Sequence, residues 1–346
     1  MSLLGLLKRL AYPQDAGAFR LWLALMVVVH HLCRWEFGKA PVLVFFALSG
    51  YWVQRVWTGQ YSQTSAAWLT FAISRWWRIA PVMILASVAS IAVLWKTQDR
   101  EWALVLQMPW RQAVSAVTVL SYAQLNTRPV GPAWSLDIEM QFYLAAPMLA
   151  IAVRRMAWPV VVLGGVLVME WALVTGHGVV LTSFLPWFLV GMVAADRGWK
   201  VSAAAARISF AVPIILVIGL WLTPWWGRFG AEGAADYALF NLVLAAFVLP
   251  FALWTVTRKG DAVDGFCADQ SFIVYMLHWP AIVLWRHYGG SFVVAAGLII
   301  AVGGLSWALW RFIDRPMNRW RKAWVAGRKL GGNFEISNRL LSPIIP

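Results

Sequence analysis

The stretch RLWLALMVVVHH, from Arg20 to His31, places a cation and an imidazole inside what otherwise has the composition of a membrane helix. Ionisable side chains are costly in hydrocarbon, so they usually face a protein interior or a water-filled cavity and carry function there. Eleven helical steps of roughly 100° return to nearly the same face, about 16 Å further along the axis. Arg20 and His31 are therefore expected on one stripe of a transmembrane helix, whereas His30 points about 100° away from it.

The whole chain has the composition of a polytopic membrane protein. It is 61% hydrophobic and 13% charged, with a mean hydropathy of +0.67, whereas a soluble domain carries about 25% charged residues. Apolar stretches of sufficient length predict an all-α fold of about ten transmembrane helices, with a further half-helix or interfacial segment near 112–123. The ten stretches are 19–35, 41–57, 80–96, 135–153, 157–175, 180–195, 208–225, 236–256, 270–287 and 291–313.

The net charge of +14 does not indicate a nucleic-acid-binding protein, because the charges lie in short loops between apolar spans. Ten spans put both termini on one side of the membrane, and that side carries 21 of the 29 Lys and Arg residues. Cytosolic loops are enriched in Lys and Arg, so both termini are predicted to be cytosolic. The expected organisation is one integral-membrane domain over residues 1–330, followed by a cytosolic tail over 331–346.

A pair of arginines precedes the third predicted span. Arg75 and Arg78 are three residues apart, so they share a helix face at the cytosolic start of that span. Guanidinium groups match phosphate geometry, and together with Arg20 the pair suits a phosphate-bearing ligand. Ordinary positive-inside anchoring is the alternative interpretation.

The segment GPAWSLDIEMQFY, residues 131–143, carries a polar stripe on the external half of the fourth predicted span. Ser135, Glu139 and Tyr143 recur every four residues and therefore lie on one helix face. Glu139 stands in an apolar run and needs a partner, for which an arginine or the His31 imidazole is the natural candidate. A purely structural ion pair is the alternative.

A third polar stripe occurs in SFIVYMLHWP, residues 271–280, where Ser271, Tyr275 and His278 share a face. A hydrogen-bonded packing stripe is the favoured interpretation there. The five histidines are scattered and show no spacing with acidic residues that would predict a metal site.

Together these clusters resemble the integral-membrane acyltransferase-3 family over about residues 15–320. The family pattern has an Arg and a His separated by ten residues, a Phe pair before Leu-Ser-Gly, R-x-x-R before a proline, W-S-L-x-x-E-x-x-F-Y, a Ser, Tyr and His helix, and a final acidic-x-Pro. Leu43 stands where the family commonly has Asp. Asp314 stands where Glu is usual. The matching residues are Arg20, His31, Phe45, Phe46, Leu48, Ser49, Gly50, Arg75, Arg78, Pro81, Trp134, Ser135, Leu136, Glu139, Phe142, Tyr143, Ser271, Tyr275, His278, Pro280, Asp314 and Pro316.

The resemblance implies transfer of an acyl group, usually acetyl, from cytosolic acyl-CoA to a hydroxyl of a cell-surface glycan or lipid-linked sugar. The expected location is the bacterial cytoplasmic (inner) membrane. His31 is the expected general base because the unperturbed pKa of histidine lies near neutrality, and Glu139 would orient or charge-balance it. The expected ligand contacts are Arg20, Arg75 and Arg78 on the CoA phosphates, and Trp134, Ser135 and Tyr143 on the acceptor side.

Other interpretations of the same residues stay open. A covalent acyl-enzyme on His31 or Ser135 would replace direct transfer. A transporter or flippase for a polar lipid or sugar also uses intramembrane His, Arg and Glu, although no internal repeat and no paired broken helices are visible. A catalytically silent scaffold is disfavoured, because the polar stripes are retained except at Leu43.

Overall fold

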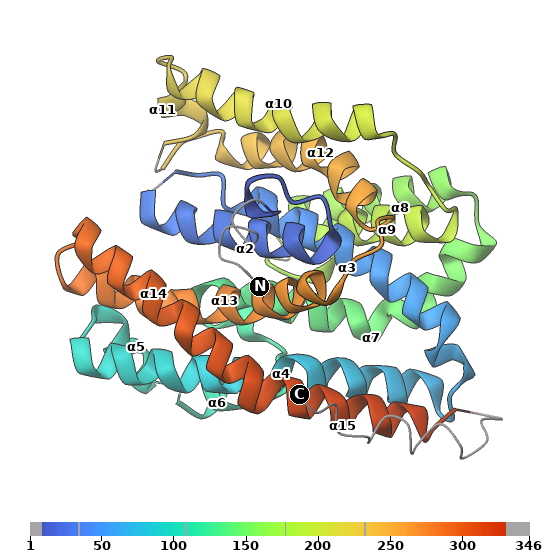
Figure 1. The fold of residues 1–346 in the computed structure, drawn as a ribbon, viewed down its shortest axis with the longest axis horizontal. Helices are drawn as coiled ribbons and strands as arrows, with labels where there is room; N and C mark the ends of the chain where they lie inside the picture. The colour runs from blue at the N-terminus through green and yellow to red at the C-terminus, as the bar shows by residue number, and fades with distance from the viewer. Residues whose placement is uncertain (1–8, 34, 108, 177, 232, 330–346) are drawn as a thin grey trace.

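The computed structural model describes residues 9–33, 35–107, 109–176, 178–231 and 233–329, and this part of the chain contains helices and no β-strand. The all-α prediction is thereby confirmed for it. The long helices run roughly side by side as one bundle (Figure 1). The predicted tail 331–346 lies outside the described residues.

Each of the ten predicted spans coincides with a helix. In the part of the chain that the structure describes, six helical segments are long and apolar enough to cross a bilayer: α2, α4, α7 with its preceding turn, α10, α12, and α14 continued into α15. The apolar helices α8 and α9 are shorter. Ten spans and cytosolic termini stay predictions. The ten helices are α2 (Ala16–Cys33), α3 (Lys39–Gly59), α4 (Ala67–Thr97), α7 (Trp134–Arg155), α8 (Trp158–Val174), α9 (Leu185–Asp196), α10 (Ala203–Trp221), α12 (Tyr237–Thr255), α13 (Ala262–His287) and α14 (Phe292–Leu309).

Shorter elements connect these helices. The segment predicted near 112–123 contains a helix that ends at Thr118, after which the chain is irregular. The short elements are the helices α5 (Arg100–Gln107), α6 (Pro109–Thr118), α11 (Trp226–Phe229) and α15 (Arg315–Ala326), the 3₁₀ turns η1 (Tyr61–Gln63), η2 (Tyr122–Gln124), η3 (Gly131–Ala133) and η4 (Leu181–Phe184), and the π-helical turn η5 (Trp310–Asp314).

The prediction starts the third span, 80–96, too late along the chain. Helix α4 starts at Ala67 rather than near residue 80, so Arg75 and Arg78 lie two to three turns inside the helix. Hydropathy missed these turns because the two arginines lower the local average, whereas a helix accommodates them where they face other helices. Both side chains are half-buried.

Glycines allow α3 and α9 to cross with their backbones in contact. A Cβ atom at Gly50 would overlap the carbonyl of Phe188, and one at Gly191 would overlap the carbonyl of Ala47. Small residues let membrane helices approach closely, where dispersion forces and close packing hold them together. The crossing fixes the position of Ser49, which neighbours Gly50 and reaches Glu139 on α7.

Helices α10 and α14 are among those that present apolar side chains outward. Helix α10 runs along one edge of the bundle in Figure 1, and large apolar side chains of α10 and α14, including Ile215 and Ile300, are exposed. Such surfaces suit contact with lipid. In contrast, α2 packs against α3 and α13, and α13 also packs against α4, so the polar stripes of these helices face the interior.

The π-helical turn η5 interrupts the long C-terminal helix at the acidic-x-Pro motif. It separates α14 from α15, which packs beside α4 (Figure 1). Asp314 at the end of this turn is 5% exposed and faces Arg78, and Pro316 stands in the first turn of α15. Single π-turns of this kind frequently mark functional sites.

Candidate active site

A small cavity of about 70 Å³ lies between α2, α3, α7 and α13. Its lining brings together residues from three of the stripes seen in the sequence. Val42 and the phenylalanines Phe45, Phe46 and Phe272, with Leu136, enclose the rest of it. The polar lining residues are Arg20, Ser135, Glu139, Ser271 and Tyr275.

Glu139 is held by two hydroxyl groups. The Ser49 hydroxyl donates to its Oε1 at 2.7 Å, and the Tyr143 hydroxyl donates to the same oxygen at 2.5 Å. Within the described chain these are the hydrogen bonds of Glu139, so the structure does not join it to His31. Arg20 lines the same cavity, and its buried Nε atom has no hydrogen-bond partner among the described residues. Arg20 and Glu139 therefore line one cavity, and no ion pair joins them among the described residues.

Ser135 and Tyr275 tie α7 to α13. Their hydroxyl oxygens are 2.9 Å apart, and the carbonyl oxygen of Pro132 lies 3.0 Å from Ser135 Oγ and 3.1 Å from Tyr275 Oη. Ser135 also lines the cavity, and its role on the acceptor side stays a prediction. Trp134 does not line it: its ring packs on Phe46 and Phe184.

Histidines gather where α2 and α13 meet, near the C-terminal end of α2. The His31 ring lies 5.4 Å from the His278 ring, nearly parallel to it, and 5.2 Å from the Trp279 ring. The His30 ring lies 4.6 Å from the His31 ring, tilted to it, and hydrogen-bonds the carbonyl of Trp35 through Nδ1. His278 is 2% exposed, its Nδ1 lies 3.3 Å from the carbonyl of Val274, and its Nε2 is buried with no described partner. A nitrogen without a partner inside a protein is available to a ligand or a water molecule.

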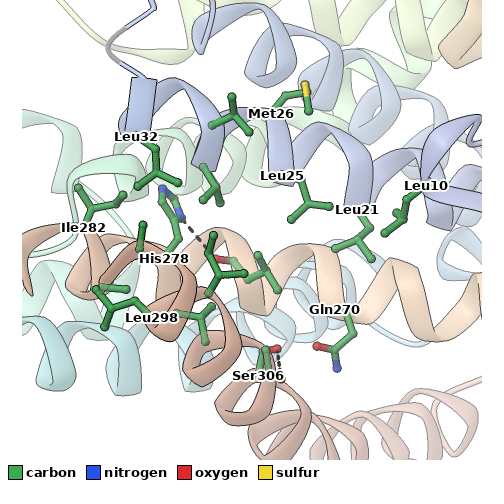
Figure 2. Close-up of a pocket in the computed structure, with 18 of the residues that line it drawn as sticks. Leu10, Leu21, Leu25, Met26, Leu32, Gln270, His278, Ile282, Leu298 and Ser306 are labelled. Atoms are coloured by element: carbon green, nitrogen blue, oxygen red, sulfur yellow. Dashed lines mark hydrogen bonds between the residues drawn. The ribbon is translucent and has the colours of Figure 1, made fainter. Parts of the chain in front are cut away.

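A much larger apolar groove of about 590 Å³ runs between α2, α13 and α14. His278 lies in its wall near Leu32, whereas Gln270 and Ser306 lie toward the other end (Figure 2). The Nε2 of Gln270 is also buried without a described partner. The groove therefore combines a hydrocarbon wall with polar atoms that the described part of the protein leaves unsatisfied.

Two arginines of α4 differ in their surroundings. Arg78 forms ion pairs with Asp269 at 3.1 Å and Asp314 at 3.6 Å. Arg75 instead lies over the rings of Tyr61, Phe71 and Tyr143, with its carbon Cζ between 5.2 and 5.8 Å from their centres. Tyr143, predicted on the acceptor side, is thus placed between Glu139 and Arg75.

Three residues near the arginines of α4 were not predicted from the sequence. Arg321 of α15 donates from Nη1 to Ser74 at 2.9 Å, in a basic segment that composition explains as membrane anchoring. Tyr61 lies in a short turn, and Asp269 precedes the recognised Ser, Tyr and His stripe. Leu43, at the position of the family's Asp, is 8% exposed and belongs to the core.

A helical membrane bundle whose interior holds these Arg, Glu, Ser, Tyr and His groups has the features of an integral-membrane acyltransferase. A family model described as an acyltransferase domain matches residues 16–311. The chain therefore belongs to the acyltransferase-3 family and is an acyltransferase, as the resemblance of its motifs implied. No curated protein and no solved structure matched it.

Proposed function

We propose that this enzyme moves an acyl group, by default acetyl, from cytosolic acyl-CoA to a hydroxyl of a glycan or lipid-linked sugar at the bacterial cytoplasmic membrane. One observation carries the proposal: polar groups follow one another through the bundle from Arg75, past Tyr143 and Glu139, to the cavity at Arg20 and Ser135. His31 and His278 lie beyond that cavity.

The predicted topology supplies a direction for this series. It places ten spans across the membrane with both termini in the cytosol, so Arg75 lies toward the cytosol and His31 toward the outside. Because Arg20 and His31 are eleven residues apart on α2, the arginine and histidine levels are separated by about 16 Å. A donor with phosphates at the arginines and a thioester on a long arm spans such a distance.

His31 is the proposed general base. It takes the proton of the acceptor hydroxyl as the oxygen bonds to the thioester carbonyl carbon. The carbon–sulfur bond breaks, and the CoA thiolate leaves and takes up a proton. A route through an acyl-enzyme on His31 or Ser135 is the competing mechanism.

Glu139 lines the same cavity as Arg20 and is bound by Ser49 and Tyr143. We therefore assign Glu139 to balancing the charge of Arg20 and shaping the passage, rather than to orienting His31. Ser135 and Tyr275 line the cavity and hold the N-terminal end of α7 against α13. Trp134 supports Phe46, which lines the cavity.

The apolar groove favours a lipid-linked acceptor over a free glycan. Its wall reaches His278, whose ring stacks near His31. A hydrocarbon chain lying in the groove would therefore present an attached sugar close to the proposed base. Burial of apolar surface would supply the binding free energy.

The test is acyl transfer by protein reconstituted in bilayer discs, with acetyl-CoA labelled in the acetyl group and membrane glycolipid as acceptor. We expect His31→Ala to abolish transfer and His30→Ala, its neighbour on the other face, to retain it. Near-normal transfer by His31→Ala would refute the assignment. If the wild-type protein moved glycolipid across the bilayer without labelling it, the flippase alternative would replace the enzyme proposal.

A further inference from the structure

Helix α15 brings a third arginine to the pair on α4. Arg321 donates from Nη1 to Ser74 Oγ at 2.9 Å and lies 3.4 Å from the Tyr61 hydroxyl. Arg75 approaches the same hydroxyl through Nη2, also at 3.4 Å. Two guanidinium groups from helices far apart in sequence thus converge on one tyrosine, which is 2% exposed.

The charges around these arginines are unequally balanced. Arg78 already has two carboxylate partners. Arg75 and Arg321 form no ion pair within the described chain. Asn318 lies between Arg321 and Asp314: it accepts a hydrogen bond from Arg321 at 3.2 Å and donates one to Asp314 at 2.9 Å. Two cations held close together repel each other. An anion between them would remove that repulsion.

Unsatisfied donors point the same way. The Nε atom of Arg75 is buried and has no hydrogen-bond partner in the part of the chain that the structure describes. Buried polar atoms are normally satisfied, so a lone guanidinium nitrogen indicates a missing acceptor. Phosphate offers several acceptor oxygens and matches the forked geometry of arginine.

We propose that Arg75 and Arg321, with the hydroxyls of Tyr61 and Ser74 beside them, bind a phosphate group of the CoA donor. Arg78 instead fastens α4 to α13 and to η5. The inference rests on the proposed function, and it adds a residue from α15, which lies beyond the 16–311 family match.

The binding test uses isothermal titration of CoA, and of adenosine 3′,5′-bisphosphate as a phosphate-bearing fragment, into protein held in phosphatidylcholine discs. Arg321→Gln and Arg75→Gln should each weaken binding of both probes about ten-fold or more, the effect of one charge-assisted contact. Arg321→Lys should fall between, since it keeps the charge but loses the fork. Arg319→Gln, an exposed arginine on the same helix, should bind CoA as the wild type does.

A second measurement separates binding from folding. S-acetyl-pantetheine carries the thioester arm without the adenosine phosphates, so its rate of acetyl transfer should be unchanged by Arg321→Gln. A variant that merely lost the docking of α15 would lose transfer from both donors, which would overturn the assignment.

The remaining outcomes are distinct. Unchanged CoA affinity in Arg321→Gln overturns this inference while leaving the proposed function intact. Failure of the wild-type protein to bind CoA at all defeats the proposed function, and the inference with it. If Arg321→Gln loses affinity for CoA only in discs that contain phosphatidylglycerol, the arginines bind a lipid headgroup and the inference is wrong.

Discussion

Replacing Arg78 with methionine removes the charge that two carboxylates share. The guanidinium lies 3.1 Å from Asp269 and 3.6 Å from Asp314, whose side chains are 33% and 5% exposed. Loss of the ion pair with the more exposed Asp269 costs about 0–1 kcal/mol of unfolding free energy. Leaving the buried Asp314 without its cation costs about 3–5 kcal/mol. Because Asn318 still donates to Asp314, we expect Arg78→Met to lower the free energy of unfolding by about 3 kcal/mol.

The assay is equilibrium unfolding in mixed detergent micelles, with CoA titration on the same samples. The double variant Arg78→Met/Asp314→Asn removes both charges. Because residues in direct contact are energetically coupled, it should recover about 1–3 kcal/mol of the unfolding free energy that Arg78→Met loses. Arg75→Met is the matched control on the same helix. It leaves no carboxylate unpaired, so it should weaken CoA binding with little change in stability.

The reasoning fails if the two arginines behave alike. An Arg78→Met protein of normal stability whose CoA affinity drops as far as that of Arg75→Met would show that Arg78 binds the donor. A double variant less stable than either single variant would show that Asp314 does not depend on Arg78.

Three further predictions test packing, charge and the α7–α13 contact. Gly191→Leu should destabilise the protein by about 1–3 kcal/mol in the same unfolding assay, because its side chain meets backbone, whereas Gly164→Leu meets open space and should be neutral. Arg9 holds the pKa of Asp261 at about 2, below its ordinary 3.8, so this carboxylate stabilises the fold above pH 4 and the effect disappears as pH falls through 2. The stability difference from Asp261→Asn, which keeps a capping side chain, should shrink over that range in thermal melts. Tyr275→Phe should cost about 1 kcal/mol of unfolding free energy, the worth of a typical hydrogen bond.

Much of the helical framework could be predicted because bilayer-sized apolar runs are a property of composition alone. Every predicted span coincided with a helix. The main error was at α4, where two arginines that face other helices lowered the average hydropathy of the first turns. Local averages carry no information about what a helix faces.

The candidate site was predictable only along single helices. Ser135, Glu139 and Tyr143 lie on one face as their four-residue spacing required, and the Tyr143 hydroxyl binds Glu139. The sequence left the partner of Glu139 open between an arginine and His31; in the fold Ser49 binds Glu139, and Arg20 lines the same cavity. Helix spacing specifies a face, but the neighbour of that face depends on how whole helices pack.

The sequence by itself determined that this chain is an all-helical membrane protein of the acyltransferase-3 type, because apolar length and ordered motifs are one-dimensional properties. Only the tertiary structure decided which charges are neutralised. Arg75 and Arg78 look equivalent in the chain, three residues apart, yet two aspartates from α13 and η5 pair with Arg78. Arg321 of α15 instead brings a second cation to Arg75, and neither has an ion pair among the described residues. The interaction energy of two charges depends on their distance in space, not along the chain, and the fold sets that distance.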